Sequence, residues 1–373
     1  MSLKQIITNN AKNIVGYSTQ RKIVVFSVDD YGNVRLDGIQ AKKNLIAGGM
    51  NLPSHFDNLD TMETTEDLEI LFDALTSVKD KNNKPAVFTP FALPCNINFE
   101  AMKQNNYQKY EYELLDKTFN KLEDRHPKKY TGTWALWKEG IEKGLLRPQF
   151  HGREHLNLKI FNQKLKDNDA ATRLCLENNS YTGIKNTEYP TISYTAAFDF
   201  WDIEENKNFE EIIASGTLHF ESVFGYKPIH FNAPGATASC IINNFIFANG
   251  MGFIDNPIIK NEHLGFGKYQ RKINYTGKKI NSGLININRN VVFEPCEGDR
   301  DWVGTAMEQI ESAFRWGKPA IISSHRVNFC GNINQDNRKK GINSLRNLLK
   351  RIIKKWPEVE FMSSEELCRI IAK

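Results

Sequence analysis

The sequence predicts a parallel α/β fold in a single domain that spans residues 1–373. Short apolar runs rich in β-branched residues alternate with longer segments of helical periodicity along almost the whole chain. Several of these runs contain no polar alternation, which is typical of strands buried on both faces of a parallel sheet. With 40% hydrophobic residues, a chain of 373 residues can bury a core of good size.

The predicted elements follow one another in a regular order. We expect strands at about residues 22–28, 85–91, 228–232, 252–255, 291–295 and 320–324. We expect helices at about residues 156–177, 209–224, 239–249, 305–316 and 343–355. Two segments, 96–140 and 261–290, fit the alternation poorly, and we expect both to be insertions into the domain.

Composition argues against several classes of partner. The net charge of +5 is mild, and the densest basic run, residues 338–355, lies on a predicted amphipathic helix whose charged face we expect to be solvated. We therefore expect no nucleic-acid partner. No apolar run approaches the length of a membrane span, and the N-terminal residues lack the apolar segment of a secretory signal. We expect no membrane partner and a cytoplasmic location.

Two adjacent carboxylates end the first predicted strand. Asp29 and Asp30 follow the apolar run 22–28 and precede Tyr31 and Gly32. Carboxylates at the end of a buried strand are costly unless they are paired, hydrogen-bonded or bound to a metal. In parallel α/β folds, this end of the strands is where the chemistry takes place. The alternative is a plain turn, since Asp and Gly both favour turns.

Two histidines four residues apart, His151 and His155, follow a segment with the pattern of a turn and a short strand. If the backbone is helical here, both imidazoles lie on one face and can reach one cation. Ordinary packing is the alternative for an isolated pair. A third histidine, His325, ends the strand predicted at 320–324.

Together these strand ends form a plausible hydrolytic site. One Asp and two His make a three-ligand set for Zn or a similar divalent ion, with a position left for water. Side chains of neighbouring residues on an extended strand point apart, so only one of the two aspartates can face the metal. The other is left as a general base, and His325 is left as a general acid.

Five segments in order resemble the motifs of the NodB-homology polysaccharide deacetylases, the carbohydrate esterase family 4 group. The similarity runs from about residue 22 to 371. The segments are Ser27-Val28-Asp29-Asp30, the stretch from Leu145 to His155, Phe231-Asn232-Ala233-Pro234-Gly235, Asp301-Trp302, and the stretch from Ile321 to His325. The resemblance implies a divergent member of this family, with a distorted barrel of seven or eight βα units.

The resemblance also implies an activity and assigns roles. It implies a metal-dependent hydrolase that removes acyl groups, N- or O-acetyl, from a carbohydrate. The family's roles would fall on Asp29 as base and His325 as acid, and Trp302 would line the sugar groove. The metal ligands would be Asp30, His151 and His155. Zn is the metal we expect, and Co, Ni and Mn suit the same ligands.

One motif departs from the family pattern. Asn232 stands where the family has an arginine that orients the base, and the motif is also one residue short. Arg326 and Arg153 are our candidates to supply the missing charge. We expect Asn232, Trp302 and Arg326 to contact the substrate.

Three other functions fit parts of the pattern. Residues 151–155 also spell the inverted zinc-peptidase motif His-x-x-Glu-His, with Glu154 as base, although Gly152 weakens the helix which that motif needs. The YdjC-like deacetylases of small sugars share the Asp-Asp-x-Gly start and an Asp-His-His ligand set. An inactive carbohydrate-binding homologue would explain the missing arginine, but it would have no use for an acid at His325.

Overall fold

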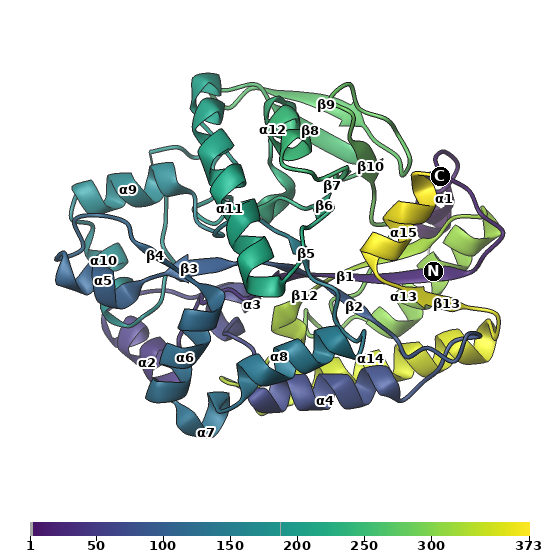
Figure 1. Ribbon diagram of the computed structural model, residues 1–373, viewed down its shortest axis with the longest axis horizontal. Helices are drawn as coiled ribbons and strands as arrows, with labels where there is room; N and C mark the ends of the chain where they lie inside the picture. Colours follow the sequence, from purple (N-terminus) through teal and green to yellow (C-terminus); the bar gives the residue numbers. More distant parts are fainter. Residues whose placement is uncertain (1–2, 187) are drawn as a thin grey trace.

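Nine parallel strands form one curved sheet in the computed structural model, which describes residues 3–186 and 188–373 (Figure 1). Eight of the strands lie in the order β10-β7-β6-β5-β2-β1-β12-β11, and β13 pairs with the first residues of β1. Their bounds are β1 Ile23–Tyr31, β2 Phe88–Ala92, β5 Gln149–Phe150, β6 His230–Phe231, β7 Phe253–Asp255, β10 Ile285–Ile287, β11 Val291–Val292, β12 Ala320–His325 and β13 Glu360–Met362. The predicted parallel α/β fold of barrel type is confirmed. Among the described residues no pairing joins β10 to β11, so the barrel is open between them.

Strand β1 is the centre of the sheet. All nine of its residues are buried, because β2, β12 and β13 flank it and helices cover the sheet. The apolar run in its sequence predicted this burial. Phe26 on β1 stacks on its neighbour Phe88 on β2, with 5.4 Å between ring centroids, and Phe150 on β5 packs against Phe231 on β6. This aromatic core fixes the strand ends that carry the site.

Helices surround the sheet. Helices α4, α8 and α14 pack side by side below it in Figure 1, and α11 lies on the opposite side. The bounds of the longer helices are α4 Thr65–Thr76, α6 Leu115–Arg125, α8 Thr133–Glu142, α9 Leu158–Lys166, α11 Phe209–Phe224, α13 Trp302–Arg315 and α14 Gln335–Lys355. The shorter ones are α1 Leu3–Ala11, α2 Ile39–Ala47, α3 His55–Leu59, α5 Phe99–Gln104, α7 Pro127–Tyr130, α10 Ala170–Glu177, α12 Asn243–Ala248 and α15 Ser364–Ile371.

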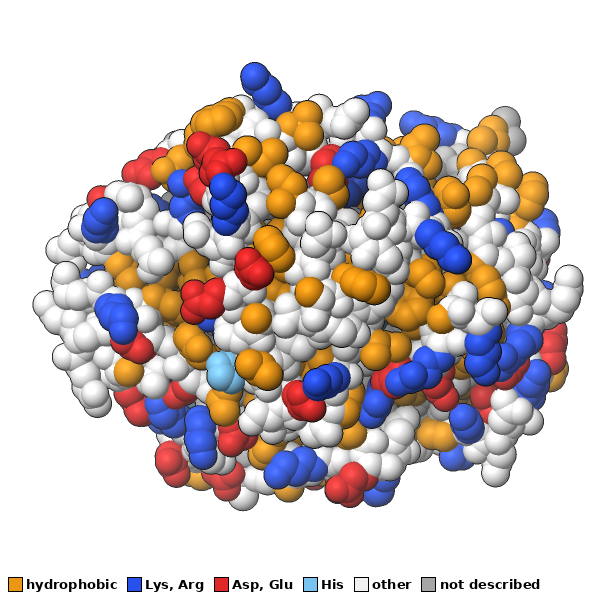
Figure 2. All heavy atoms as spheres, turned by 45° about the horizontal axis from the view of Figure 1, so that its top comes forward, with side chains coloured by type: hydrophobic (Ala, Val, Ile, Leu, Met, Phe, Trp, Pro, Cys, Tyr) orange, Lys and Arg blue, Asp and Glu red, His pale blue; other side chains and the backbone are white. Residues whose placement is uncertain are grey.

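Helix α14 begins earlier than the predicted residue 343, because the side chain of Asn334 caps its first turn. Its basic residues form ion pairs within the chain: Arg338 with Asp67, and Arg346 with Asp73. On the face shown in Figure 2, Lys and Arg side chains are interspersed with Asp and Glu. No helix in the described part of the chain is both long and apolar enough to span a membrane.

The two expected insertions differ in outcome. Residues 96–140 carry α5 to α8 and a small antiparallel pair, β3 (Cys95–Ile97) with β4 (Tyr112–Leu114). Residues 261–290 hold most of a hairpin, β8 (Ile259–His263) with β9 (Tyr269–Ile273). They also hold β10, which pairs with β7 in the main sheet, so the prediction of an insertion is wrong for those residues. Polar Asn286 at the centre of β10 breaks the apolar signal of a buried strand.

Candidate active site

The end of β1 turns its two carboxylates in different directions. Asp29 stays in register with His325 on the neighbouring strand β12. The pairing with β2 then shifts between Val28 and Tyr31, and Asp30 adopts a left-handed backbone conformation with φ of 74°. Asp tolerates this conformation better than most residues. The predicted separation of the two carboxylates is therefore present, and an irregularity in the strand produces it.

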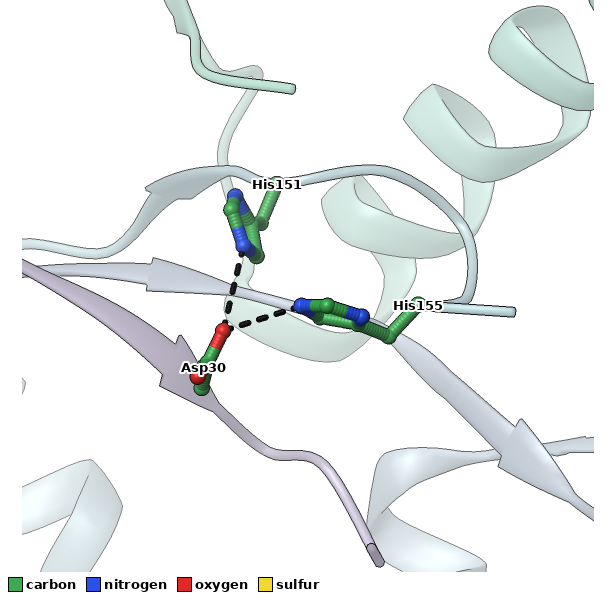
Figure 3. Close-up of side chains that lie close together, drawn as sticks. All are labelled: Asp30, His151 and His155. Carbon is green, nitrogen blue, oxygen red and sulfur yellow. Dashed lines mark hydrogen bonds and ion pairs between the residues drawn. The ribbon is translucent and has the colours of Figure 1, made fainter. Parts of the chain in front are cut away.

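Asp30, His151 and His155 come together at this strand end (Figure 3). Each is buried, and one ligand atom from each lies within 4.8 Å of the others. Oδ1 of Asp30 is 3.0 Å from Nε2 of His155 and 3.4 Å from Nε2 of His151. Tetrahedral Zn with bonds of ~2.0–2.1 Å separates its ligand atoms by roughly 3.3 Å. These three residues form a candidate metal site.

The hydrogen bond of His151 favours a cation at this position. Its Nδ1 lies 2.7 Å from the backbone oxygen of Asn232, and a carbonyl oxygen can only accept, so Nδ1 carries the proton. Nε2 is therefore the ring nitrogen that remains to bind a metal, and it faces Oδ1 of Asp30 at 3.4 Å. Within the described residues this buried Nε2 has no hydrogen-bond partner. A cation placed between Nε2 and Oδ1 would contact both atoms, so the residues fit the implied metal.

Electrostatics at the cluster favour the ligand forms of the side chains. Burial lowers the pKa of His155, which favours the neutral imidazole that a metal binds. Burial also works to raise the pKa of Asp30, but the charge interaction with His155 and the hydrogen bonds with His151 and His155 outweigh that effect and hold the pKa of Asp30 well below its usual range. An ionised carboxylate and two imidazoles make a donor set that Zn and related metals take.

Arg289 holds Asp29 in a fixed orientation. Its two terminal nitrogens lie 2.7 and 2.8 Å from the two carboxylate oxygens of Asp29, and its Nε lies 2.7 Å from Asp255. The Nδ2 of Asn232 donates a third hydrogen bond to Asp29 at 2.9 Å. Asn232 thus connects Asp29 to the metal cluster through its side chain and its backbone oxygen. The family pattern has an arginine beside the base, and here Arg289, which follows β10, supplies that positive charge beside Asp29.

The two arginines proposed from the sequence lie elsewhere. Arg326 is 1% exposed, and its guanidinium pairs with Asp60 and Glu63 at 2.7 and 3.0 Å. Because its guanidinium is buried in these two ion pairs, Arg326 does not contact Asp29 or a substrate in the cavity, and the prediction that it does so is wrong. Arg153 pairs with the adjacent Glu154 at 2.7 Å and so does not supply the charge either. The sequence motif placed Arg326 on the correct strand end, but its side chain points into the core.

His325 has an acidic partner that the sequence analysis missed. Its Nδ1 lies 2.8 Å from Oε1 of Glu294, and its Nε2 lies 3.9 Å from Oδ2 of Asp29. Although burial works in the opposite direction, the hydrogen bond and charge of Glu294 raise the pKa of His325 to about 10. The imidazole is therefore protonated at neutral pH. Glu294 lies just after β11, where the sequence showed only the end of a strand.

A cavity of about 420 Å³ opens in front of these groups. Asp29, Asn232, Arg289 and His325 line it. Trp302 is not among the lining residues in the described part of the chain. It is half-buried at the start of α13, and its indole donates a hydrogen bond to the backbone oxygen of Glu297. Its contact with a sugar stays a prediction.

The segment that joins the two histidines is a loop. Gly152 has a φ of 119°, which no helix contains, and residues 151–155 have no helical assignment. Glu154 is buried and accepts hydrogen bonds from Arg153 and Tyr110. The inverted peptidase motif needs a helix and a free glutamate base, and neither is present in this described segment.

No family model and no curated protein matches the sequence. Among solved structures, the chain is similar to a protein assigned as a polysaccharide deacetylase from Mycobacterium smegmatis (TM-score 0.44, 11% identity, 96% of this chain and 93% of that chain). It is similar to another protein so assigned from Pseudomonas aeruginosa PAO1 (0.43, 8%, 94% and 91%) and to the allantoinase Puue (0.41, 12%, 95% and 91%). A 4-α-glucanotransferase, a GH57 branching enzyme and the α-amylase AmyC match as well. Polysaccharide deacetylases thus match nearly the whole chain at low identity.

Proposed function

We propose that this protein is a metal-dependent hydrolase that removes acetyl or similar acyl groups from a carbohydrate. One observation carries the proposal: a carboxylate and a protonated imidazole, Asp29 and His325, share a cavity directly beside a buried Asp-His-His cluster. This combination supplies a base, an acid and a metal position, which are the three parts that hydrolysis without a covalent intermediate requires. The ordered motifs of the sequence support a carbohydrate as the substrate.

Asp30, His151 and His155 would hold the ion. A divalent ion bound there would polarise the acyl carbonyl and lower the pKa of a water molecule. Asp29 takes a proton from the attacking water as the new C–O bond forms. Protonated His325 then donates its proton to the leaving nitrogen or oxygen as the C–N or C–O bond breaks. Arg289 and Asn232 keep Asp29 oriented through both events.

Metal content and acetate release test this proposal together. We expect wild-type protein purified without chelators to carry close to one Zn, Co, Ni or Mn per chain, by mass spectrometry, and His151→Ala to lose it. We expect Asp29→Asn to keep the metal and lose acetate release from acetylated sugars by ~100-fold or more, as removal of a general base predicts.

His126→Ala is the matched control, since His126 is half-exposed and pairs with Asp37. It should change neither the metal content nor the rate. Glu154→Gln distinguishes the deacetylase from the peptidase alternative. A deacetylase should keep full activity in this variant, whereas a peptidase with Glu154 as its base would lose it. Absence of metal from wild type, even after reloading, would contradict the proposal.

A further inference from the structure

The hairpin of β8 and β9 lies at the outer edge of the molecule, at the top of Figure 1. The outward face of most surface hairpins is polar, but here the pattern is reversed. On the inner face Lys260 and Glu262 are buried and form an ion pair at 3.2 Å. On the outer face Ile259 and Ile273 lie opposite each other across the two strands and are 63% and 71% exposed. This arrangement indicates that something other than water covers the outer face.

Further apolar side chains extend this outer face along the whole hairpin. The exposed apolar residues that we call the hairpin surface are Val15, Ile259, Leu264, Phe266, Tyr269 and Ile273. Val15 belongs to it because the N-terminal segment is tied to the hairpin: the backbone N–H of Tyr17 donates to the backbone oxygen of Thr276 at 2.7 Å. Single exposed apolar residues are common on proteins, but a cluster of them marks an interaction site.

The hairpin is fixed to the body of the protein. The imidazole of His263 on β8 stacks between the rings of Phe200 and Tyr269, with centroids 4.6 and 4.7 Å away. Its Nδ1 also lies 2.9 Å from the carboxylate of Asp199. Because the ribbon is held in this way, its projecting side chains lose little conformational entropy when they meet a partner.

The charges at the hairpin surface are positive. Residues 257–279 contain six lysines and arginines and one acid, Glu262, which is buried. Lys268, Arg271 and Lys279 are exposed and form no ion pair with any described residue. Since Arg271 is at the centre of β9, antiparallel pairing of two copies along this strand would bring like charges together. The charges therefore favour an anionic partner over a second copy of this chain.

The shape of the surface favours a lipid bilayer over a folded protein. Its side chains project, and the hollow that Val15, Ile258 and Tyr275 line has a volume of only about 20 Å³, which is room for about one water molecule. Protein partners bind mainly through a few side chains that fill pockets. A bilayer needs no pocket, because projecting apolar side chains enter it while aromatic and basic residues lie at the level of its headgroups.

We propose that the hairpin surface docks on a lipid bilayer that carries anionic headgroups. The two isoleucines and Phe266 enter the boundary between headgroups and acyl chains, and the three unpaired basic residues meet the lipid phosphates. Docking of this kind needs no spanning helix. Asn256 and Pro257, which directly precede this hairpin, line the cavity of the candidate active site, so docking holds that cavity close to the lipid surface. The docking is independent of the proposed hydrolysis.

Sedimentation with large unilamellar vesicles measures this docking. We expect wild-type protein to pellet with phosphatidylcholine vesicles that contain about one-third phosphatidylglycerol, and to stay in solution with phosphatidylcholine alone. The double variant Ile259→Ser, Ile273→Ser should bind the anionic vesicles about 10-fold more weakly, because it loses apolar transfer into the lipid. The triple variant Lys268→Gln, Arg271→Gln, Lys279→Gln should bind about 100-fold more weakly, at about 5-fold for each charge, and should lose most of the salt dependence.

Two control variants carry matched changes outside the hairpin surface. Leu218→Ser removes an exposed apolar side chain from α11. The triple variant Lys339→Gln, Lys350→Gln, Lys354→Gln removes the same net charge from exposed positions on α14. Neither should change vesicle binding by more than about 2-fold, because distant charges are screened. All the substituted side chains are exposed, so every variant should keep the Tm of the wild type.

Each other outcome overturns the proposal. Equal weakening by the two triple variants, with no effect of the isoleucine double variant, would show a general attraction of a basic protein to an anionic surface. A dimer in analytical ultracentrifugation that Ile259→Ser, Ile273→Ser abolishes, without vesicle binding, would identify a second copy as the occupant. Binding to soluble polyglutamate but not to vesicles would identify an acidic polypeptide. None of these readouts depends on metal content or acetate release, so their failure leaves the proposed function untouched.

Discussion

Arg289 is the residue on which the orientation of the proposed base depends. Its paired hydrogen bonds to Asp29 require a planar guanidinium, and lysine keeps only the charge. We expect Arg289→Lys to lower kcat about 30-fold, since one lost charge-assisted hydrogen bond costs about 2 kcal/mol. KM and metal content should stay unchanged. The exposed residue Arg369, which pairs with Glu365 on its own helix, gives the control Arg369→Lys. An unaltered kcat, or loss of the metal, would contradict this role.

The pairing of His325 with Glu294 predicts a pH dependence. The pKa of His325 in the folded protein, about 10, exceeds its ordinary value of 6.5, so folding favours the protonated form. The contribution of the His325–Glu294 pair to the free energy of unfolding is complete below pH 6.5 and is lost as the pH rises through 10. The proposed acid should likewise lose its proton, and kcat should fall, near pH 10.

In Glu294→Gln this alkaline limb of the kcat profile should move to lower pH, toward 6.5, because the amide cannot stabilise the imidazolium. Glu297→Gln, at an exposed position nearby, is the control and should leave the limb in place. An alkaline limb that Glu294→Gln does not move would show that another group limits the rate at high pH.

The candidate ligands could be predicted from the sequence because each lies next to a recognisable local pattern. Asp30 ends an apolar strand, and His151 and His155 are four residues apart. Arg289 carries no such signal. Arg289 follows a three-residue strand with Asn286 at its centre and lies 260 residues from Asp29 along the chain, so only the curvature of the sheet shows that the two residues meet. The order of the strands in the sheet decides which distant residues meet, and a local sequence pattern holds no information about that order.

At the scale of secondary structure, prediction succeeded where a buried strand is a long apolar run and failed where it is short and contains a polar residue. β1 and β12 were found because their apolar runs are continuous. β10 was missed because three residues centred on Asn286 resemble a loop. The irregularity at the end of β1 was missed for a related reason: a positive φ at Asp30 leaves no mark on a sequence that would equally suit a regular strand.

The loop from His151 to His155 depends on Gly152. A Cβ at this position would lie 3.0 Å from a ring carbon of Phe198, and the φ of 119° is strained for any other residue. We expect Gly152→Ala to destabilise the fold by about 2 kcal/mol and to reduce metal content, because the loop must shift one or both histidines. Calorimetry and metal analysis of the same preparation measure the two effects.

Gly144→Ala is a suitable comparison. Gly144 also has a positive φ, 68°, but a Cβ there would meet nothing within 4 Å. It should lose some stability and keep the metal. If the two variants behave alike, the loop tolerates a Cβ and does not constrain the histidines.

Across the whole molecule, a buried charge network joins the end of β12 to the long connection between β1 and β2. Arg326 reaches Asp60 and Glu63, which lie shortly before α4, and also the backbone oxygen of Asn33 after β1. All these side-chain contacts are buried. Removal of one partner from a buried ion pair costs about 3–5 kcal/mol, because the remaining charge is uncompensated. We therefore expect Arg326→Ala to lower the free energy of unfolding by that amount.

The pH dependence of this loss identifies its cause. Burial raises the pKa of Asp60, and Arg326 opposes that rise. Without the guanidinium the pKa of Asp60 rises further, the native state binds a proton that the unfolded chain does not, and the deficit of Arg326→Ala should shrink as the pH falls from 8 to 5. Arg346→Ala removes a largely exposed pair with Asp73 and should cost less than about 1 kcal/mol at either pH. A deficit that is independent of pH would instead attribute the loss to packing of the Arg326 side chain, and no charge network would then be needed to hold the β1–β2 connection against the sheet.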